Sequence, residues 1–157
     1  MLPDGFIVAE RIATDVDVGS KKRALEKLAS LLAKGDPGLI KGAVFDRLLD
    51  RERLGGTGLG HGIALPHARM PEATEARGAF IRLEHGIDYD AIDGRPVDLA
   101  LAMLVPAEAT EEHLQLLASL AHLFNDEKVC EQLRNAKSPD AILTLLNGAG
   151  DPDTIRQ

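Results

Sequence analysis

The sequence contains no tryptophan and only one cysteine, and aromatic residues make up 3% of its 157 residues. The lone Cys130 can form neither an intrachain disulfide nor a zinc site built on several thiolates. No segment approaches the roughly 18 uninterrupted apolar residues that a membrane-spanning helix requires. Residues 1–5 lack the basic and apolar runs of a signal peptide. We therefore expect a cytoplasmic protein without membrane insertion.

Basic residues are also scarce, with 18 lysines and arginines against 25 acidic residues and a net charge of −7. Nucleic-acid binders usually carry a basic stripe, but the densest basic cluster in this chain is the short run 21–23. The few aromatic residues offer no stacking platform for single strands. We therefore expect no nucleic-acid partner, and a protein partner should present a basic or apolar patch.

The composition is that of an ordinary globular domain, with 45% hydrophobic and 27% charged residues. The length fits one domain, and no internal repeat or low-complexity linker divides the chain. We therefore predict a single domain over residues 6–147. Residues 1–5 and 148–157 are polar and rich in Asp, Pro and Gly, so we expect flexible ends.

Hydrophobic periodicity predicts helices and strands that alternate along the chain. Helices are expected at 21–34, 39–53, 110–125, 127–136 and 139–147, and extended segments at 7–18, 63–65, 78–83 and 97–105. The last of these strands is apolar at almost every position, which is typical of a central strand covered on both faces. The predicted fold is therefore an α/β single-domain sandwich, a mixed central sheet flanked by helices on both faces.

A glycine-rich segment, residues 55–62, holds five glycines in eight positions and predicts an irregular loop. A nucleotide-binding P-loop requires Lys followed by Ser or Thr after its last glycine, whereas this chain continues with His61-Gly62. The dinucleotide fingerprint requires a strand before the glycines and a helix after them. Here a helix precedes and a strand follows, so neither nucleotide motif fits.

The five histidines differ in their settings: His61, His67, His85, His113 and His122. The spacing of His61 and His67 admits a metal, but no acidic residue stands at ligand spacing and the HExxH pattern is absent. We therefore expect no metal and no cofactor. His85 falls in a predicted turn, His122 lies on a solvated helix face, and His61 has no assignable role.

His67 follows Pro66 directly after the glycine loop, a setting that suits phosphoryl transfer. Glycines let backbone N–H groups approach an anion, and a neutral imidazole keeps one ring nitrogen free to attack phosphorus. Arginine matches phosphate oxygens with its planar fork. Arg51 at the end of the preceding helix is the candidate, with Arg53 and Arg69 as rivals.

His113 is the candidate for a second, supporting imidazole. It lies on the apolar face of its predicted helix and near the helix N-terminus, where the dipole favours an anion. Each feature taken alone also has an ordinary structural explanation. His67 can be a hydrogen-bonded loop residue, Arg51 a solvated helix-end cation, and the glycine run a flexible connector.

Together these residues resemble a known family. Segment 54–67, ending in Leu65-Pro66-His67, is similar to the active-site segment of the mannitol/fructose-type IIA domains of the bacterial phosphoenolpyruvate-dependent phosphotransferase system. Four further segments match that family in order and spacing, namely 80–83, 90–97, 104–107 and 113–117. The resemblance covers about residues 6–146. One departure is Ala68, where many members carry glycine.

The resemblance implies a phosphohistidine carrier in which His67 accepts a phosphoryl group from a small histidine phosphocarrier protein of the HPr or NPr type. The family's second active-site histidine falls on His113 and its arginine on Arg51. A chain of one domain is most similar to the nitrogen-regulatory branch. This similarity implies a regulatory role rather than metabolic turnover. Potassium-transport regulators and sensor kinases are the implied partners.

Two alternatives from other classes stay open. A sugar-specific IIA component would pass its phosphate to a IIB domain for sugar uptake. A binding module would leave His67 unphosphorylated and bind its partner regardless.

Overall fold

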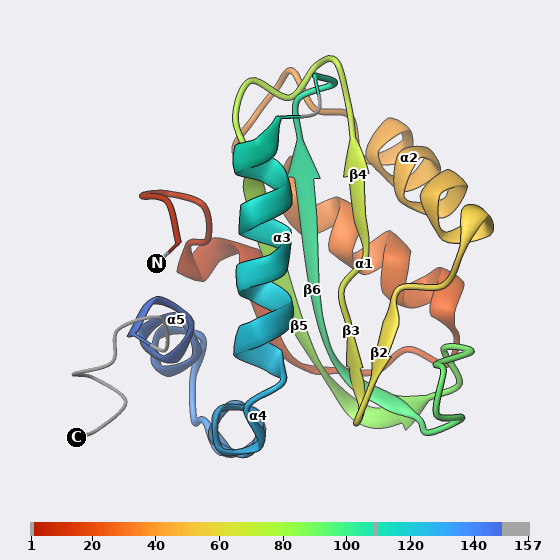
Figure 1. Cartoon of the computed structure of the whole chain (residues 1–157), viewed down its shortest axis with the longest axis vertical. Coiled ribbons are helices and arrows are strands. Elements are labelled where there is room, and N and C mark those ends of the chain that lie inside the picture. The colour runs from red at the N-terminus through yellow and green to blue at the C-terminus, as the bar shows by residue number, and fades with distance from the viewer. Residues whose placement is uncertain (1, 109, 149–157) are drawn as a thin grey trace.

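A mixed six-stranded sheet divides the molecule into two helical layers (Figure 1). The computed structural model describes residues 2–108 and 110–148. Of the ends expected to be flexible, 1–5 and 148–157, residue 1 and residues 149–157 lie outside the described residues. The strands are β1 (Ile12–Val16), β2 (Gly58–Gly60), β3 (Ile63–Ala64), β4 (His67–Arg69), β5 (Arg77–Ile87) and β6 (Val97–Val105). The helices are a 3-10 turn (Ala9–Arg11), α1 (Lys21–Ala33), α2 (Lys41–Leu54), α3 (Glu111–Phe124), α4 (Glu127–Asn135) and α5 (Pro139–Gly148).

The sheet order is β1-β5-β6-β3-β2, and β4 also pairs with β6. Successive side chains of β6 enter two separate cores, as the period of a strand requires. Ala100, Ala102 and Leu104 pack with α1 and α2, whereas Leu99, Leu101 and Met103 pack with α3, α4 and α5. The predicted α/β sandwich is therefore confirmed, with β6 as its doubly covered central strand.

Three helices, α1, α3 and α5, begin directly after a capping side chain. The side-chain oxygens of Ser20, Thr110 and Ser138 each accept a hydrogen bond from the backbone N–H three residues later. Such caps satisfy donors that the first helical turn leaves unpaired. In the described part of the chain, no helix is long and apolar enough to cross a bilayer.

Two expectations about strands were wrong. β5 does not end near residue 83 but continues to Ile87, so His85 lies in a strand rather than in a turn. Its residues 84–86 are exposed and polar, which gives them the composition of a turn.

The glycine loop contains β2, which pairs antiparallel with β3. Gly58 is required there because a Cβ would lie 3.0 Å from Ala91, so the glycines serve a close approach of two segments.

Backbone pairing with β6 stops at Ala64 and resumes after Pro66, at His67. Ile63 pairs with Leu99 and His67 pairs with Met103, so β3 and β4 keep one register along β6 with no inserted residue. The Pro66 carbonyl accepts a hydrogen bond from the Met103 N–H at 2.9 Å, but proline has no N–H to return. The two strands are one strand with a missing donor, and His67 begins its second half.

A buried arginine ties the N-terminal segment to the sheet. Arg11 is 7% exposed, and its guanidinium donates at 2.9 Å to three backbone carbonyls, those of Gly5, Phe6 and Gly78. Buried carbonyls that lose such a donor remain unsatisfied. Arg11 therefore holds residues 5–6 against the start of β5.

Replacing Arg11 with methionine should lower the free energy of unfolding by about 2–4 kcal/mol, because two buried carbonyls and one partly buried carbonyl lose a charged donor. Urea denaturation followed by circular dichroism measures the change. The matched control is Arg23→Met on α1, whose side chain is 69% exposed and which should stay within about 0.5 kcal/mol of wild type. Equal losses in the two variants would contradict this role of Arg11.

Candidate phosphoryl-transfer site

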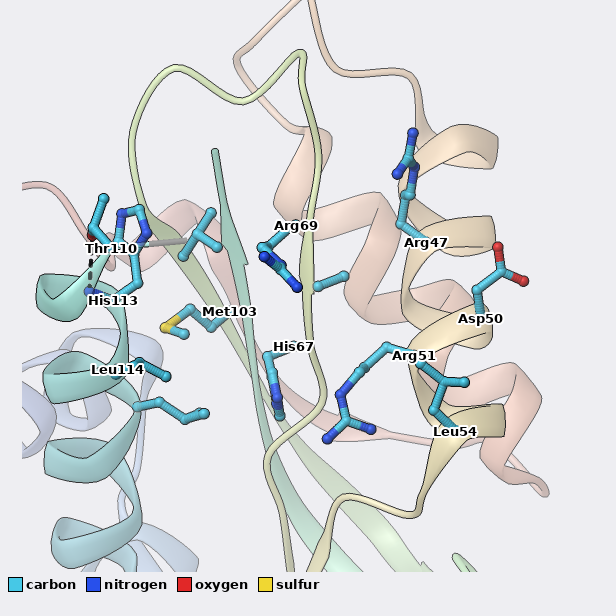
Figure 2. A pocket seen from close by; sticks show the side chains of 13 residues that line it. Arg47, Asp50, Arg51, Leu54, His67, Arg69, Met103, Thr110, His113 and Leu114 are labelled. Atoms are coloured by element: carbon cyan, nitrogen blue, oxygen red, sulfur yellow. Dashed lines mark hydrogen bonds between the residues drawn. The ribbon is translucent and has the colours of Figure 1, made fainter. Parts of the chain in front are cut away.

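A cavity of about 660 Å³ lies over β4, between the second half of α2 and the first turns of α3 (Figure 2). Its walls come from both helical layers and its floor from β4 and β6. The lining residues are Arg47, Asp50, Arg51, Leu54, His67, Ala68, Arg69, Met103, Val105, Thr110, His113, Leu114 and Leu117. All three residues that the sequence singles out, His67, His113 and Arg51, therefore line one cavity.

His67 is half-buried, and its ring is held by a single backbone contact. Nδ1 lies 2.9 Å from the Leu65 carbonyl oxygen. A carbonyl can only accept, so Nδ1 carries the proton and donates it, which leaves the lone pair on Nε2. Burial lowers the pKa of His67 below its ordinary value, and the Arg51 charge adds to this, while the Leu65 bond opposes it. The ring is therefore neutral near pH 7.

The Arg51 side chain extends from α2 toward the His67 ring. It lies in the last turn of α2, donates from Nη1 to the Gly55 carbonyl at 2.9 Å, and points toward His67 (Figure 2). Of its two rivals, Arg69 also lines the cavity, two residues after His67 on β4. Arg53 does not line it and instead pairs with Asp50 at 3.5 Å.

His113 stands on the opposite wall, in the first turn of α3 (Figure 2). Its backbone N–H donates to the Thr110 cap. Its ring nitrogen Nδ1 is buried and has no hydrogen-bond partner among the described residues. The cavity thus places an unengaged imidazole across from an arginine, with a neutral histidine on the strand between them.

Comparison with known proteins decides the family. The sequence model of the family described as "Phosphoenolpyruvate-dependent sugar phosphotransferase system, EIIA 2" matches residues 6–149. The chain belongs to this EIIA 2 family.

Among relatives of this EIIA 2 chain, the nitrogen regulatory protein of Klebsiella oxytoca is 44% identical over 138 residues, covering 87% of this chain and 85% of the relative. The crystal structure of the nitrogen regulatory protein IIA-Ntr from Neisseria meningitidis has a TM-score of 0.84 at 40% identity, covering 90% of this chain and 96% of the other. Mannitol IIA from Escherichia coli, solved in complex with phosphorylated mannitol IIB, has a TM-score of 0.74 at 28% identity, covering 90% and 97%.

The EIIA 2 chain's remaining histidines lie outside the cavity. His122 is exposed, as expected. His61 adopts φ 57° in a turn before β3, where its N–H donates to the Asp93 carboxylate at 2.8 Å and its carbonyl accepts from Arg134 at 2.9 Å. Cys130 is buried, and its Sγ donates to the Phe124 carbonyl. Within residues 2–108 and 110–148, no group of three or more metal-ligating side chains assembles.

Sequence reasoning missed two contributors to the EIIA 2 site. Arg47 lines the cavity one helical turn before Arg51, and the i,i+4 spacing of the two arginines was the available signal. Glu52 is buried at 6% exposure beneath the glycine loop. Its carboxylate accepts from the backbone N–H and the hydroxyl of Thr57. No sequence pattern marks it as buried, because a glutamate between two arginines at a helix end resembles a solvated residue.

The His67 pKa should lie below 6.5, since burial and the Arg51 charge both disfavour the imidazolium. The neutral ring should therefore persist as the pH falls through 6.5, and Arg51→Met should raise the pKa toward its ordinary value by removing the repelling cation. NMR titration of the histidine ring protons measures both values. Arg53→Met, which removes a cation outside the cavity, is the control. A His67 pKa above 6.5 in the wild type would contradict the site's electrostatics.

Proposed function

We propose that this EIIA 2 protein, as one domain over residues 6–147, is a phosphohistidine carrier that accepts a phosphoryl group on Nε2 of His67. The observation that carries the proposal is the hydrogen bond from His67 Nδ1 to the Leu65 carbonyl. It assigns the proton to one nitrogen and leaves the other as a nucleophile beside Arg51. The donor is a small phosphocarrier protein of the HPr or NPr type, itself bearing a phosphohistidine.

The transfer is an in-line displacement at phosphorus. The His67 Nε2 lone pair forms the new N–P bond while the donor's N–P bond breaks and its electron pair returns to the donor imidazole. No proton moves, because His67 keeps the proton on Nδ1. The ring gains positive charge as Nε2 bonds to phosphorus, so the bond from Nδ1–H to the Leu65 carbonyl becomes charge-assisted and stronger.

Arg51 and His113 stabilise the transferred group from opposite sides in this proposal. The charge of a phosphoryl group in transfer is spread over its equatorial oxygens. The Arg51 guanidinium is pointed at His67 and suits two of these oxygens. The His113 imidazole lines the other wall and supplies a donor to the third. Arg47 and Arg69 add positive charge to the same cavity.

We further propose a regulatory output in the cytoplasm rather than sugar uptake. The support is similarity, since the chain is 44% identical to a nitrogen regulatory protein, compared with 37% to a fructose-specific EIIA component of Haloferax volcanii and 28% to mannitol IIA. Phosphorylation adds about 1.5–2 negative charges at the cavity, so a protein partner can distinguish the two forms electrostatically. Potassium-transport regulators and sensor kinases are the partner classes proposed. The second candidate, transfer to a sugar-specific IIB domain, is favoured by the mannitol IIA–IIB complex.

Incubation with phosphoenolpyruvate and the upstream phosphocarrier proteins should add one phosphoryl group, visible in the intact mass and lost in mild acid. His67→Ala should abolish the gain, because it removes the nucleophile. His122→Ala, an exposed histidine on α3 outside the cavity, should keep it. No gain by the wild type with a demonstrably active donor would contradict the proposal. Discharge by a IIB domain would favour the sugar-specific alternative.

A further inference from the structure

A continuous path of hydrogen bonds runs from the buried Glu52 to the ring of His67. The Glu52 carboxylate accepts from the Thr57 backbone N–H at 2.8 Å. The Thr57 carbonyl accepts from the Leu65 N–H at 2.9 Å. The Leu65 carbonyl in turn accepts from His67 Nδ1 at 2.9 Å. Three hydrogen bonds therefore connect a carboxylate on α2 with the imidazole on β4.

The path is shielded from water along most of its length. Glu52, Thr57 and Leu65 are 6%, 5% and 2% exposed. Hydrogen bonds in such surroundings are stronger and more directional than in water, because the local dielectric constant is low. Breaking one leaves a buried donor or acceptor without a substitute. The Thr57 carbonyl is therefore one of the contacts that place Leu65, beside the pairing of its neighbours with β6.

The carboxylate of Glu52 is held from three separate parts of the fold. Besides the N–H and hydroxyl of Thr57, it accepts from the Tyr89 hydroxyl at 3.4 Å and pairs with Lys21 Nζ at 3.5 Å. The same Nζ lies 4.7 Å from the centre of the Tyr89 ring. The Glu52 side chain is 2% exposed and that of Lys21 is 23% exposed, and burying a charge in such a pair is costly and adds little net stability compared with apolar packing. Net stability therefore does not explain why a carboxylate occupies this position.

Glu52 and its neighbour Arg51 form hydrogen bonds to the same loop from opposite sides. Arg51 faces the cavity and donates to the Gly55 carbonyl, whereas Glu52 faces the core and holds Thr57. Residues 55–57 are thus fixed at both ends relative to the last turn of α2. The loop therefore holds Arg51 directly and His67 through Leu65, which fixes the two side chains relative to each other.

We propose that Glu52 is a positioning residue for His67, acting through Thr57 and the Leu65 carbonyl to hold the ring in the tautomer that leaves Nε2 free. The inference rests on the proposed function for its catalytic meaning, since a free Nε2 matters only if it accepts phosphorus. The tautomer itself is a property of the unphosphorylated protein.

The test is Glu52→Gln, which keeps the side chain's size and removes its charge. In 15N NMR of the uniformly labelled, unphosphorylated protein at alkaline pH, wild-type His67 should show a protonated Nδ1 and an unprotonated Nε2. Glu52→Gln should populate the other tautomer. Its kcat for phosphoryl acceptance should fall about 10- to 100-fold, the scale of a small misplacement of a reacting group, while KM for the donor changes little.

Asp46→Asn is the matched control, because Asp46 is an exposed carboxylate on the same helix that does not line the cavity. It should retain both the wild-type tautomer and the wild-type kcat. Thr57→Ser keeps both donors to Glu52 and should retain most of the activity. Thr57→Val loses only the hydroxyl, should show an intermediate shift, and carries the test if Glu52→Gln does not fold.

A folded Glu52→Gln protein with the wild-type tautomer and kcat would overturn the inference, as would a change in KM alone. If Glu52→Gln does not fold, an unchanged tautomer and kcat in Thr57→Val would overturn it. Because the tautomer is measured without a donor, this result is independent of whether phosphoryl transfer occurs. A wild-type protein that is never phosphorylated, yet changes tautomer in Glu52→Gln, would refute the proposed function and support the positioning role.

Discussion

The hydrogen bond from His67 to the Leu65 carbonyl is the contact on which the site depends. It decides which ring nitrogen is protonated, and hence which is a nucleophile. The carbonyl is available because β3 and β4 form a single strand in unbroken register along β6. Pro66 interrupts the donors of this strand without displacing its path. A rigid, doubly packed central strand thereby fixes the reactive histidine through its neighbour.

One cavity is lined by residues of both helical layers because it lies at an edge of the sheet. In the part of the chain that the structure describes, β4 pairs only with β6, since β2 extends the sheet beside β3. The open side of β4 allows Arg51 to reach His67 from α2, which packs on one face of the sheet, while His113 approaches from α3 on the other (Figures 1 and 2). Arg51 and the second imidazole therefore line one cavity with His67, although the helices that carry them are separated by the sheet.

The sequence predicted the parts of the fold that depend on local rules. Ser20, Thr110 and Ser138 mark helix starts because capping is a short-range hydrogen bond, and β6 is recognisable because both of its faces are apolar. β4 was missed because a three-residue strand after a proline has no pattern of its own. It exists only because β6 offers it backbone partners.

The same distinction holds in the site. His67, Arg51 and His113 lie in motifs and at helix ends, so residue type and spacing led to them. Glu52 and Tyr89 become neighbours only when the glycine loop folds back on α2, a long-range event that no local pattern encodes. Tyr89 stands between Asp88 and Asp90, outside every predicted helix and strand, yet it is completely buried. Long-range contacts of this kind require the structure.

The central claim is that the protein's own hydrogen bonding selects Nε2 of His67 as the phosphoryl acceptor. Long-range 1H–15N correlation spectra of the phosphorylated, 15N-labelled protein test it most directly, because they identify the ring nitrogen bonded to phosphorus. The account predicts phosphorus on Nε2 and a retained proton on Nδ1. Phosphorus on Nδ1 would contradict it, since that nitrogen is the one engaged by the Leu65 carbonyl.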